Sequence, residues 1–506
     1  MAGAPQLSQP PQRRRVVGGV LAAVALVLSV LGAVVPAPAE LHTGTTWYVS
    51  RRGDGTVGTS WATAWRQPSA INWAEVNPGD RIVLDGGPTP CPSDYAFGAG
   101  VTVPPGRTCG MAYRAPFVVG ASGAPGEPIT IALATSRGRD GTAVLAGGRT
   151  SPLPYCDQRS YTPSGVARST GILFPARSHI VVNGMHRSGI MISGARSGID
   201  LHSDRTSYVV LRNLELFDNG TFGKWRHGYR TDGEGISLAG NHITVDRTLI
   251  HDNGQDAIQD TDTGVPGTGH APLHDITVSN SWLYEHRPSP LWPGYGFNSG
   301  AQDVPRQDCT HVDGLQVWGG GLDQQRMTFS HDVFGPFLAQ GVYPGDNNVA
   351  SFDHVVVTDS LFLNTLDHAI IGARIAADPV TPADWRISRV TSYLTSRPNA
   401  GLHSHGKLDL AGSGHTVTKS LFYYGYSAAR RTTGSGNIWW GGDPVPGGRR
   451  IRPAFSSRMP AGAAPSFRQL RTLHLAPQCR ACAGVGSPLH DVADLLHRID
   501  RLNRTG

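Results

Sequence analysis

A short strand pattern recurs along the chain between Leu211 and Val417, and in each copy apolar residues alternate with polar ones. A repeat that consists only of short β-segments cannot bury its apolar face alone, so it must stack on its neighbours. The pattern therefore predicts a solenoid. The residues expected to stack inward follow one another at steps of 33, 51, 28, 30 and 30 residues, at Val245, Val278, Phe329, Val357, Ile387 and Val417.

The period of the pattern indicates which kind of solenoid this is. Alternation with a period of two excludes helical repeats, and no leucine grid marks a leucine-rich repeat. Each unit carries a second short strand, at Gly235–Leu238, Ala257–Gln259, Gly314–Val317, Gly341–Tyr343, Ala369–Ile371 and Gly401–His403. Corresponding strands that stack in parallel, two or three to a turn, form a parallel β-helix. From about Thr45 to Trp440 the chain resembles the right-handed parallel β-helix proteins of the pectate-lyase-like type.

This resemblance implies an all-β fold, a single-stranded right-handed parallel β-helix with an N-terminal helical cap and a short C-terminal extension. A short helix expected at Ser69–Val76 covers the open end of the core. We expect cap and first coils over 40–150, the β-helix with groove-forming loops over 151–440, and a Pro/Gly/Arg-rich linker and helical appendage over 441–506. One face of that appendage carries Val492, Leu495, Leu496, Ile499 and Leu502.

Residues 1–39 have the features of an export signal. Arg13, Arg14 and Arg15 precede an apolar run from Val16 to Val35, and Ala37-Pro38-Ala39 supplies a small-x-small cleavage site before Glu40. The sequence thus predicts a secreted protein. The alternative is an uncleaved membrane anchor, because the apolar run is long enough to span a bilayer.

The net charge and the cysteine content limit which partners and which cellular compartment we expect. The net charge of +6 becomes +3 once the three signal arginines are removed, and the body has no basic run, so nucleic acid is not an expected partner. We expect a monomer. An even number of cysteines in an exported chain favours disulfides. The expected pairs are Cys91–Cys109, Cys156–Cys309 and Cys479–Cys482, the last preferred to half of a zinc site with His474 and His490.

The candidate chemistry lies in one column of the stack. The residue before each second strand is Glu234, Asp256, Asp313, Gln340, His368 or Ala400 on successive coils. Neighbouring strands lie about 4.8 Å apart, so the first three form a ladder of carboxylates. Like charges at that spacing require protonation, a cation or basic neighbours. One Asp before Gly is ordinary turn chemistry, but three on consecutive coils favour a functional site.

Long insertions and aromatic residues accompany the same coils. The insertions are Thr221–Asp232, Thr261–Leu273 and Pro288–Asp308, and their aromatic residues are Trp225, Tyr229, Trp292, Tyr295 and Phe297, with Trp318 on the strand after Asp313. Lengthened loops on adjacent coils form the walls of a groove. The outward residues of the strands suggest an exposed ligand platform, made of Ser237, Gln259, Gln316, Tyr343, His403 and His405.

The segment Thr310-His311-Val312-Asp313-Gly314 resembles the Asn-Thr-Asp-Gly signature of polygalacturonase-type glycoside hydrolases, with Asp313 at the catalytic position. Gln255-Asp256-Ala257-Ile258 resembles their Asp-Asp-Cys-Ile segment. This chain has His311 and Gln255 in place of the family's Asn and first Asp, and the two segments occur in reverse order. Ser404-His405-Gly406-Lys407 is only faintly similar to the family's Gly-His-Gly.

Three classes of function remain open: polysaccharide hydrolysis by paired carboxyls, β-elimination or epimerisation on a uronic-acid polymer, and glycan binding without turnover. For hydrolysis the candidate catalytic residues are Asp313, Asp256, Glu234 and His311. In a lyase, Ca²⁺ held by Asp256, Asp260 and Glu234 neutralises the substrate carboxylate, as could Arg230 or Arg287. The base that removes the substrate proton in such a lyase is then His311, His251 or Lys407. The expected substrate-binding residues are Gln316, Gln259, Trp318, Tyr343, Trp292, His403, His405, Lys407 and Arg230.

Overall fold

The structure is a computed structural model in which the chain divides into two units, Met1–His42 and Thr43–Gly506. The residues that it describes all belong to the second unit, so the export signal and its cleavage remain predictions. These residues are 44–91, 109–148, 169–201, 203, 205–225, 228–260, 273–286, 312–317, 323–336, 338–343, 351–363, 365, 368–372, 382–393, 407–424, 427–428, 432–441, 444–452, 468, 474 and 482–505. Among the helices described there, none is long and apolar enough to cross a bilayer.

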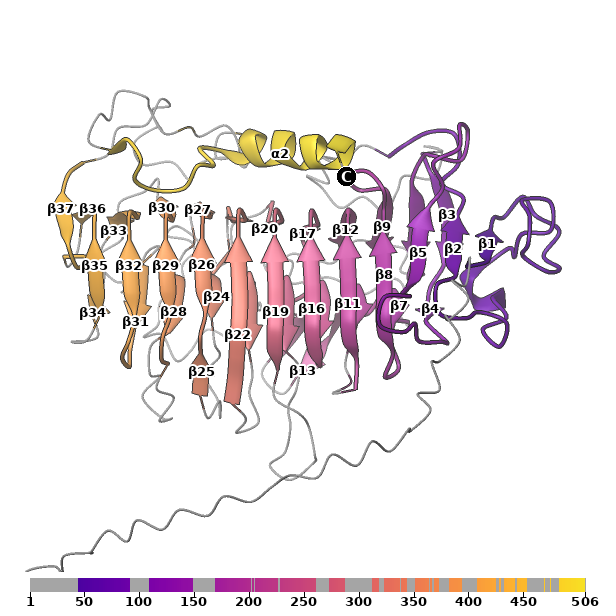
Figure 1. The fold of residues 1–506 in the computed structure, drawn as a ribbon, viewed down its shortest axis with the longest axis horizontal. Coiled ribbons are helices and arrows are strands. Elements are labelled where there is room, and N and C mark those ends of the chain that lie inside the picture. The colour runs from indigo at the N-terminus through magenta and orange to yellow at the C-terminus, as the bar shows by residue number, and fades with distance from the viewer. Residues whose placement is uncertain are drawn as a thin grey trace, which may run out of the picture. The chain divides into compact units, whose positions relative to one another are not determined.

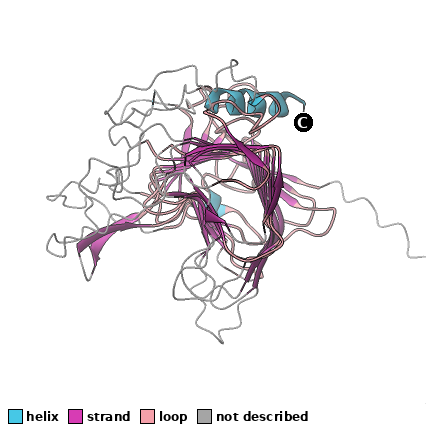
Figure 2. Ribbon diagram, turned by 90° about the vertical axis from the view of Figure 1, so that its left-hand side faces the viewer, coloured by secondary structure: helices cyan, strands magenta, loops and turns pink. Residues whose placement is uncertain are grey.

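Three long parallel sheets form the body of this second unit, and most coils contribute one strand to each sheet (Figures 1 and 2). Sheet A consists of β1 (Thr46–Val49), β2 (Arg81–Leu84), β5 (Ile129–Leu133), β8 (Ser178–Asn183), β11 (Ser207–Arg212), β16 (Asn241–Asp246), β19 (His274–Ser279), β22 (Asp323–Ser330), β25 (Ser351–Asp353), β26 (Val356–Thr358), β29 (Arg386–Ser388), β32 (Thr416–Thr418) and β35 (Thr433–Ser435).

Sheet B consists of β3 (Met111–Arg114), β6 (Ala143–Ala146), β9 (Ile190–Ser193), β12 (Leu214–Phe217), β17 (Leu249–His251), β20 (Trp282–Tyr284), β23 (Val333–Phe334), β27 (Leu361–Leu363), β30 (Thr391–Tyr393), β33 (Leu421–Tyr424), β36 (Asn437–Gly441) and β37 (Gly448–Arg450). Sheet C consists of β4 (Phe117–Val118), β7 (Ile172–Leu173), β10 (Ile199–Asp200), β15 (Ile236–Leu238), β18 (Ile258–Asp260), β21 (Leu315–Val317), β24 (Gln340–Tyr343), β28 (His368–Gly372), β31 (Lys407–Leu410) and β34 (Ser427–Ala428). The insertion at Thr221–Asp232 forms a separate hairpin of β13 (Thr221–Trp225) and β14 (Gly228–Asp232).

This topology confirms the expected fold, an all-β right-handed parallel β-helix. Strands of one sheet pair in register from coil to coil, and alternation turns every second side chain inward. The predicted inward residues of sheet A are paired partners on five consecutive steps, from Val245 with Val278 to Ile387 with Val417. Each of them is at most 1% exposed, so that prediction is confirmed.

The corner between sheets A and B is made by a single residue in the left-handed conformation on each of many coils. These residues are Asn213, Arg247, Asn280, His331, Asp359, Arg389 and Lys419, with φ between 48° and 58°. On several coils the residue that follows is polar, and its side chain accepts a backbone N–H from the coil before. Examples are Ser281 Oγ from Thr248 and Asp332 Oδ1 from Ser281, at 3.2 and 2.9 Å. These bonds satisfy backbone donors that the bend removes from the sheets.

The N-terminal cap contains less helix than expected. The helix predicted at Ser69–Val76 is only the 3₁₀-helix η1 (Pro68–Ala70), because Ile71 returns to extended backbone at ψ 125°. The Asn72 amide then donates to Glu75 at 2.7 Å and favours a turn over a helix. The segment still covers the end of the core, since Ile71 and Val76 belong to the main apolar cluster.

The C-terminal helix α2 (Val492–Thr505) is confirmed, but it lies along the side of the coils (Figure 1). Four of the five predicted residues of its apolar face are buried, whereas Leu502 is partly exposed. They pack on outward residues of sheet B, namely Leu249, Trp282, Tyr284, Val333, Leu361, Leu363 and Tyr393. Polar contacts fix its position: Arg498 donates to Asn280 at 2.6 Å and Arg247 donates to Asn503 at 2.7 Å.

One expected disulfide, Cys91–Cys109, is present. Cys482 is also disulfide-bonded. Its expected partner Cys479 and the expected pair Cys156–Cys309 lie outside the described residues.

Asp332 provides a test of the corner. Burial raises its pKa well above the ordinary value, and its Oδ2 is buried without a hydrogen-bond partner among the described residues. A raised folded-state pKa of an Asp means that stability is complete below about pH 4 and falls as pH rises towards the folded-state pKa. Asn437 occupies the same corner position on another coil and donates to two carbonyls at 2.7 Å. The free energy of unfolding of Asp332→Asn should therefore exceed that of wild type by about 1–3 kcal/mol at pH 7. Near pH 3 the two free energies should be equal.

Urea titrations at several pH values measure this difference. Asp384→Asn serves as a control, because the Asp384 side chain is 55% exposed and also lies at a positive φ. Identical pH dependence in wild type and Asp332→Asn would show that Asp332 is not the titrating group.

Candidate functional site

The carboxylate column of sheet C is present in the structure. Ile236 pairs with Ile258 and Ile258 with Leu315, so the residues two places earlier, Glu234, Asp256 and Asp313, occupy equivalent positions on consecutive coils. Backbone bonds confirm this register: the N–H groups that follow Glu234 and Asp256 donate to the carbonyls of Asp256 and Asp313, at 3.1 and 2.9 Å. Gln340 continues the column and pairs with His368, whereas Ala400 lies outside the described residues.

Amide groups hold the middle carboxylate of the column. Asp256 Oδ1 accepts the backbone N–H of Asp313 at 2.7 Å, and Oδ2 accepts from Gln259 Nε2 at 2.8 Å. The same Gln259 nitrogen donates to Gln316 Oε1 at 2.9 Å on the next coil. On the preceding side, Ser197 donates to Glu234 Oε2 at 3.1 Å. The column is therefore bound into a polar network that spans several coils.

Burial corrects the expectation of an exposed platform. Ser237, Gln259, Gln316 and Tyr343 are each at most 5% exposed, so for these four residues the expectation is wrong. The two glutamine side chains bond along the stack to each other instead of extending into solvent. The carboxyls are buried as well, with Glu234 at 7% exposure and both aspartates at 0%.

The three residues proposed to hold calcium do not converge. Glu234 and Asp256 lie at the start of their strands, but Asp260 lies at the far end of β18, where it pairs with inward Leu238 and Val317. The strand itself covers only Ile258–Asp260, and Asp256 precedes it across the bend at Ala257. Asp260 therefore lies at the opposite end of β18 from Asp256, and the calcium site remains a prediction.

Several predicted site residues cannot be placed. His311, Trp292, Trp318, His403, His405 and Arg287 lie outside the described residues, and so do the side chains of Arg230 and Lys407. His251 is placed, between Asp252 and Glu215. Burial lowers the pKa of His251, but the bonds to Asp252 and Glu215 outweigh burial and raise the pKa to about 9. A histidine whose two ring nitrogens both contact carboxylates has no nitrogen left for a substrate proton, so His251 does not suit the role of general base.

The bonds of His251 belong to an ionic cluster that the sequence analysis missed. It joins Glu215 of β12, His251 and Asp252 at the end of β17, and Glu285 and His286 after β20. Asp252 Oδ2 contacts the Nδ1 atoms of both histidines. The only signal in the sequence is an acid beside a histidine at the ends of two successive sheet B strands, His251-Asp252 and Glu285-His286.

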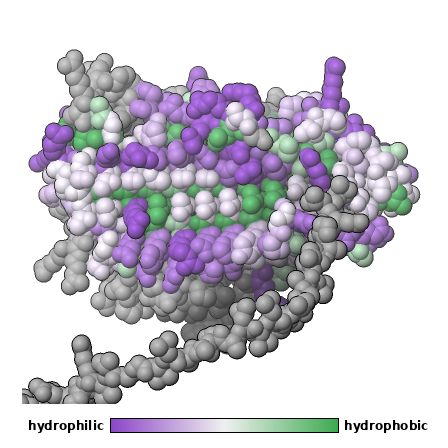
Figure 3. All heavy atoms as spheres, viewed as in Figure 1, coloured by the Kyte–Doolittle hydropathy of each residue, from purple (hydrophilic) through white to green (hydrophobic). Residues whose placement is uncertain are grey.

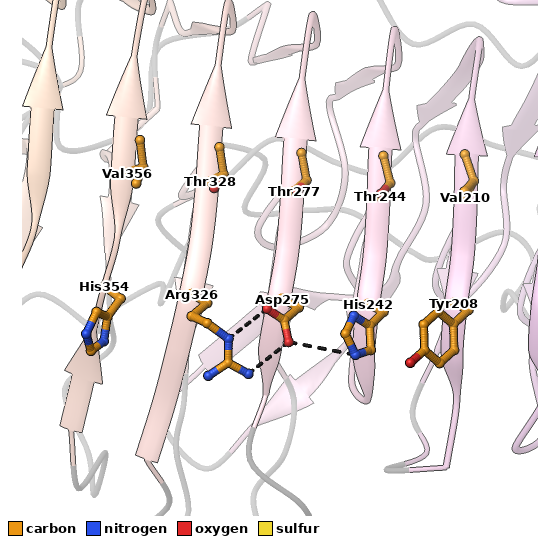
Figure 4. A pocket seen from close by; sticks show the side chains of 10 residues that line it. All are labelled: Tyr208, Val210, His242, Thr244, Asp275, Thr277, Arg326, Thr328, His354 and Val356. Carbon is orange, nitrogen blue, oxygen red and sulfur yellow. Dashed lines mark hydrogen bonds and ion pairs between the residues drawn. The ribbon is translucent and has the colours of Figure 1, made fainter.

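A shallow groove of about 590 Å³ runs across the outer face of sheet A (Figure 4). Figure 3 shows a paler strip between two hydrophilic bands on this face. The floor of the groove consists of β-branched residues, and one side carries rings and charges. The lining residues are Tyr208, Val210, His242, Thr244, Asp275, Thr277, Arg326, Thr328, His354 and Val356.

Opposite charges alternate along that side of the groove. Arg326 donates to both oxygens of Asp275, at 2.7 and 2.8 Å, and His242 lies 3.8 Å away on the other side. The hydrogen bonds from Arg326 lower the pKa of Asp275 well below its ordinary value. Beyond His242, the ring of Tyr208 lies parallel to it at 4.4 Å and is about half exposed. The groove thus offers donors, acceptors and an exposed tyrosine ring, with the charges of Asp275 and Arg326 paired to each other.

Comparisons with known proteins find similarity to solved structures only. No protein-family model and no curated protein matches the sequence. Similar solved structures include pectate lyase Pel9A, which is 15% identical with a TM-score of 0.41 over 80% of this chain and 78% of that chain. An alginate lyase from Paenibacillus sp. str. FPU-7 is 16% identical with a TM-score of 0.33 over 76% and 96%. A lacto-N-biosidase from Eubacterium ramulus is 12% identical with a TM-score of 0.34 over 77% and 67%. These likenesses concern the fold alone.

Gly314, directly after Asp313, provides a test of how tightly the column is packed. A Cβ there would lie 2.5 Å from the carbonyl oxygen of Gly341 and 2.6 Å from the ring of Phe334. Gly314→Ala should lower the free energy of unfolding by about 1–3 kcal/mol, because overpacking forces the backbone to shift. Thermal denaturation measures this. Ala257→Gly, at the same position one coil earlier, should cost less than about 1 kcal/mol, and equal losses would contradict the packing argument.

Proposed function

We propose that this protein is a carbohydrate-active enzyme that cleaves a polysaccharide by glycoside hydrolysis at the carboxylate column. The observation that carries the proposal is the placement of Glu234, Asp256 and Asp313 on three consecutive coils. Hydrolysis requires an acid and a second carboxylate, about 5–5.5 Å apart in retaining enzymes and 6.5–9.5 Å apart in inverting ones. Carboxyl groups on adjacent coils, about 4.8 Å apart, suit the spacing of retaining enzymes, and those on alternate coils approach the spacing of inverting ones.

The contacts of the column support an assignment of roles. Asp256 accepts an N–H on each of its oxygens, which orients it as the carboxylate that acts as nucleophile or base. Asp313, on the coil after Asp256, is then the acid. Glu234 is the equivalent carboxyl on the coil before Asp256. The proposed enzyme works outside the cytoplasm after cleavage of the signal before Glu40, and it acts as a monomer.

Asparagine substitution tests the roles. Asp256→Asn and Asp313→Asn keep the shape of the side chain and remove the charge, so the fold should survive, as circular dichroism and thermal denaturation can verify. Turnover should fall by about 10²–10⁴ because a positioned acid or base contributes that much to the rate. Asp409→Asn on sheet C is a control outside the column. Full activity in both column variants would refute the assignment.

A polysaccharide panel tests the reaction itself. New reducing ends without absorbance of an unsaturated uronate are the expected result. New ends with that absorbance would mean β-elimination. Loss of that activity with a chelator would then support calcium, in place of Arg230 or Arg287, as the group that neutralises the substrate carboxylate. Neither signal over a broad panel would contradict cleavage and leave glycan binding.

Glycan binding without cleavage is a second candidate function, and the groove of sheet A favours it. The paired Asp275 and Arg326 offer acceptors and donors to sugar hydroxyls, and Tyr208 adds an exposed ring. Since these groups carry no net charge, they suit a neutral glycan. Tyr208→Ala and Arg326→Ala should each weaken retention in affinity electrophoresis with neutral polysaccharides several-fold. Val57→Ala, which changes an exposed apolar residue elsewhere, should have no effect. Unchanged retention in both groove variants would rule out this surface.

A further inference from the structure

We propose that His251, Asp252 and His286 bind a divalent transition-metal ion of the zinc type at the ends of β17 and β20. The site uses none of the residues of the carboxylate column, and its converging ligand atoms are two imidazole nitrogens and one carboxylate oxygen, whereas calcium prefers a set made of oxygens.

The ligand atoms already converge on one point. Asp252 Oδ2 lies 2.7 Å from His251 Nδ1 and contacts His286 Nδ1. The three atoms all lie within 4.8 Å of one another. The backbone N–H of His286 donates to the other oxygen, Asp252 Oδ1, at 3.0 Å, which holds the carboxylate in this orientation. Two imidazole nitrogens and one carboxylate oxygen form a donor set that suits zinc, with a further position left for water or another carboxylate.

A second carboxylate, that of Glu215, contacts His251 on the side of the ring opposite Asp252. Glu215 Oε1 lies 3.1 Å from His251 Nε2, the nitrogen that faces away from Asp252. A metal-bound histidine usually donates its other N–H to a carboxylate, which fixes the tautomer and aims the free nitrogen at the ion. The Glu215 side chain is fully buried, so this contact is not an incidental surface pairing.

Aromatic rings fix the plane of that histidine. The ring of Phe217 lies parallel to His251 at 5.4 Å on one side, and the ring of Tyr284 lies parallel at 4.6 Å on the other. All three are register partners on consecutive sheet B strands. Tyr284 also meets His286 edge-on at 5.2 Å. The ligands are therefore held in place before any ion binds.

The charge of the cluster also favours a cation. Three carboxyl groups, of Glu215, Asp252 and Glu285, surround two histidines. Two of their oxygens, Glu215 Oε2 and Glu285 Oε1, are buried without a hydrogen-bond partner in the described structure. Buried acceptors of this kind are costly unless something compensates them. A divalent ion on Asp252 offsets the negative charge of these carboxyl groups.

An ion can reach this site from solvent. The side chains of Asp252 and His286 are 19% and 8% exposed, whereas that of His251 is 1% exposed. The ion would connect two successive coils at the start of the turn that leads from Asp252 to Asp256. Its expected role is to stiffen this turn.

Metal content tests the proposal independently of any enzymatic activity. The mature protein, produced with zinc and dialysed, should contain one zinc per chain by mass spectrometry of the metal. Substituted Co²⁺ should give visible d–d bands, and removal of zinc by chelation should lower the Tm reversibly. His286→Gln should lose the zinc and the Tm response, with an unchanged circular dichroism spectrum.

A matched control is available on sheet A. His242, His274 and Asp275 also lie together, but Arg326 contacts both oxygens of Asp275 and Nδ1 of His274. His274→Gln should therefore keep zinc and its Tm response. If wild type holds no more zinc than His286→Gln, the cluster is a metal-free ionic network and the proposal is overturned. Loss of zinc in the control alone would overturn it as well.

Discussion

The in-register pairing of successive coils is the constraint on which the rest of the structure depends. Because each strand bonds to its equivalent on the next coil, residues at the same place in the repeat lie about 4.8 Å apart. Every side chain therefore has its own equivalents as nearest neighbours. Apolar residues form the inward columns, the amide of Asn219 donates to Asn253 at 3.0 Å, and the rings of His179, Tyr208 and His242 lie parallel.

The same constraint makes charge along a column costly unless opposite charges alternate. The fold follows this rule at most places, since Asp246 meets Arg212, Asp275 meets Arg326 and Asp359 meets Arg389 on neighbouring coils. The column of sheet C departs from it, because Glu234, Asp256 and Asp313 follow one another directly. Amide groups of Gln259 and of the backbone hold Asp256 in place of a cation. This departure from a local rule on three consecutive coils is the basis of the catalytic role proposed for the column.

The sequence predicted what depends on period and local pattern. Alternation with a period of two was sufficient for the inward residues of sheet A and for the column, and helical spacing was sufficient for the apolar face of α2, because each pattern repeats residue by residue along the chain. It failed for Gln259 and Gln316, which were expected to face solvent, because their burial follows from a bond between two coils. It also missed the ionic cluster, in which Asp252 and His286 are 34 positions apart and neither lies in a recognisable motif. The helix expected near Ser69 was too long because Ile71 adopts an extended backbone and the Asn72 side chain stabilises a turn.

The turn from His251 to Asp256 connects these observations physically. At one end Asp252 is bound to two histidines, and at the other Asp256 is held by N–H donors on both oxygens. Between them, Asn253 accepts from Asn219 and donates to the carbonyl of Leu216, at 3.0 and 3.2 Å. So short a turn, fixed at both ends and at its middle, cannot move without breaking bonds on two coils. The position of Asp256 is therefore set by residues that have no part in the proposed chemistry. A catalytic carboxyl needs this kind of support, because misplacement by about 1 Å can cost a large share of the rate.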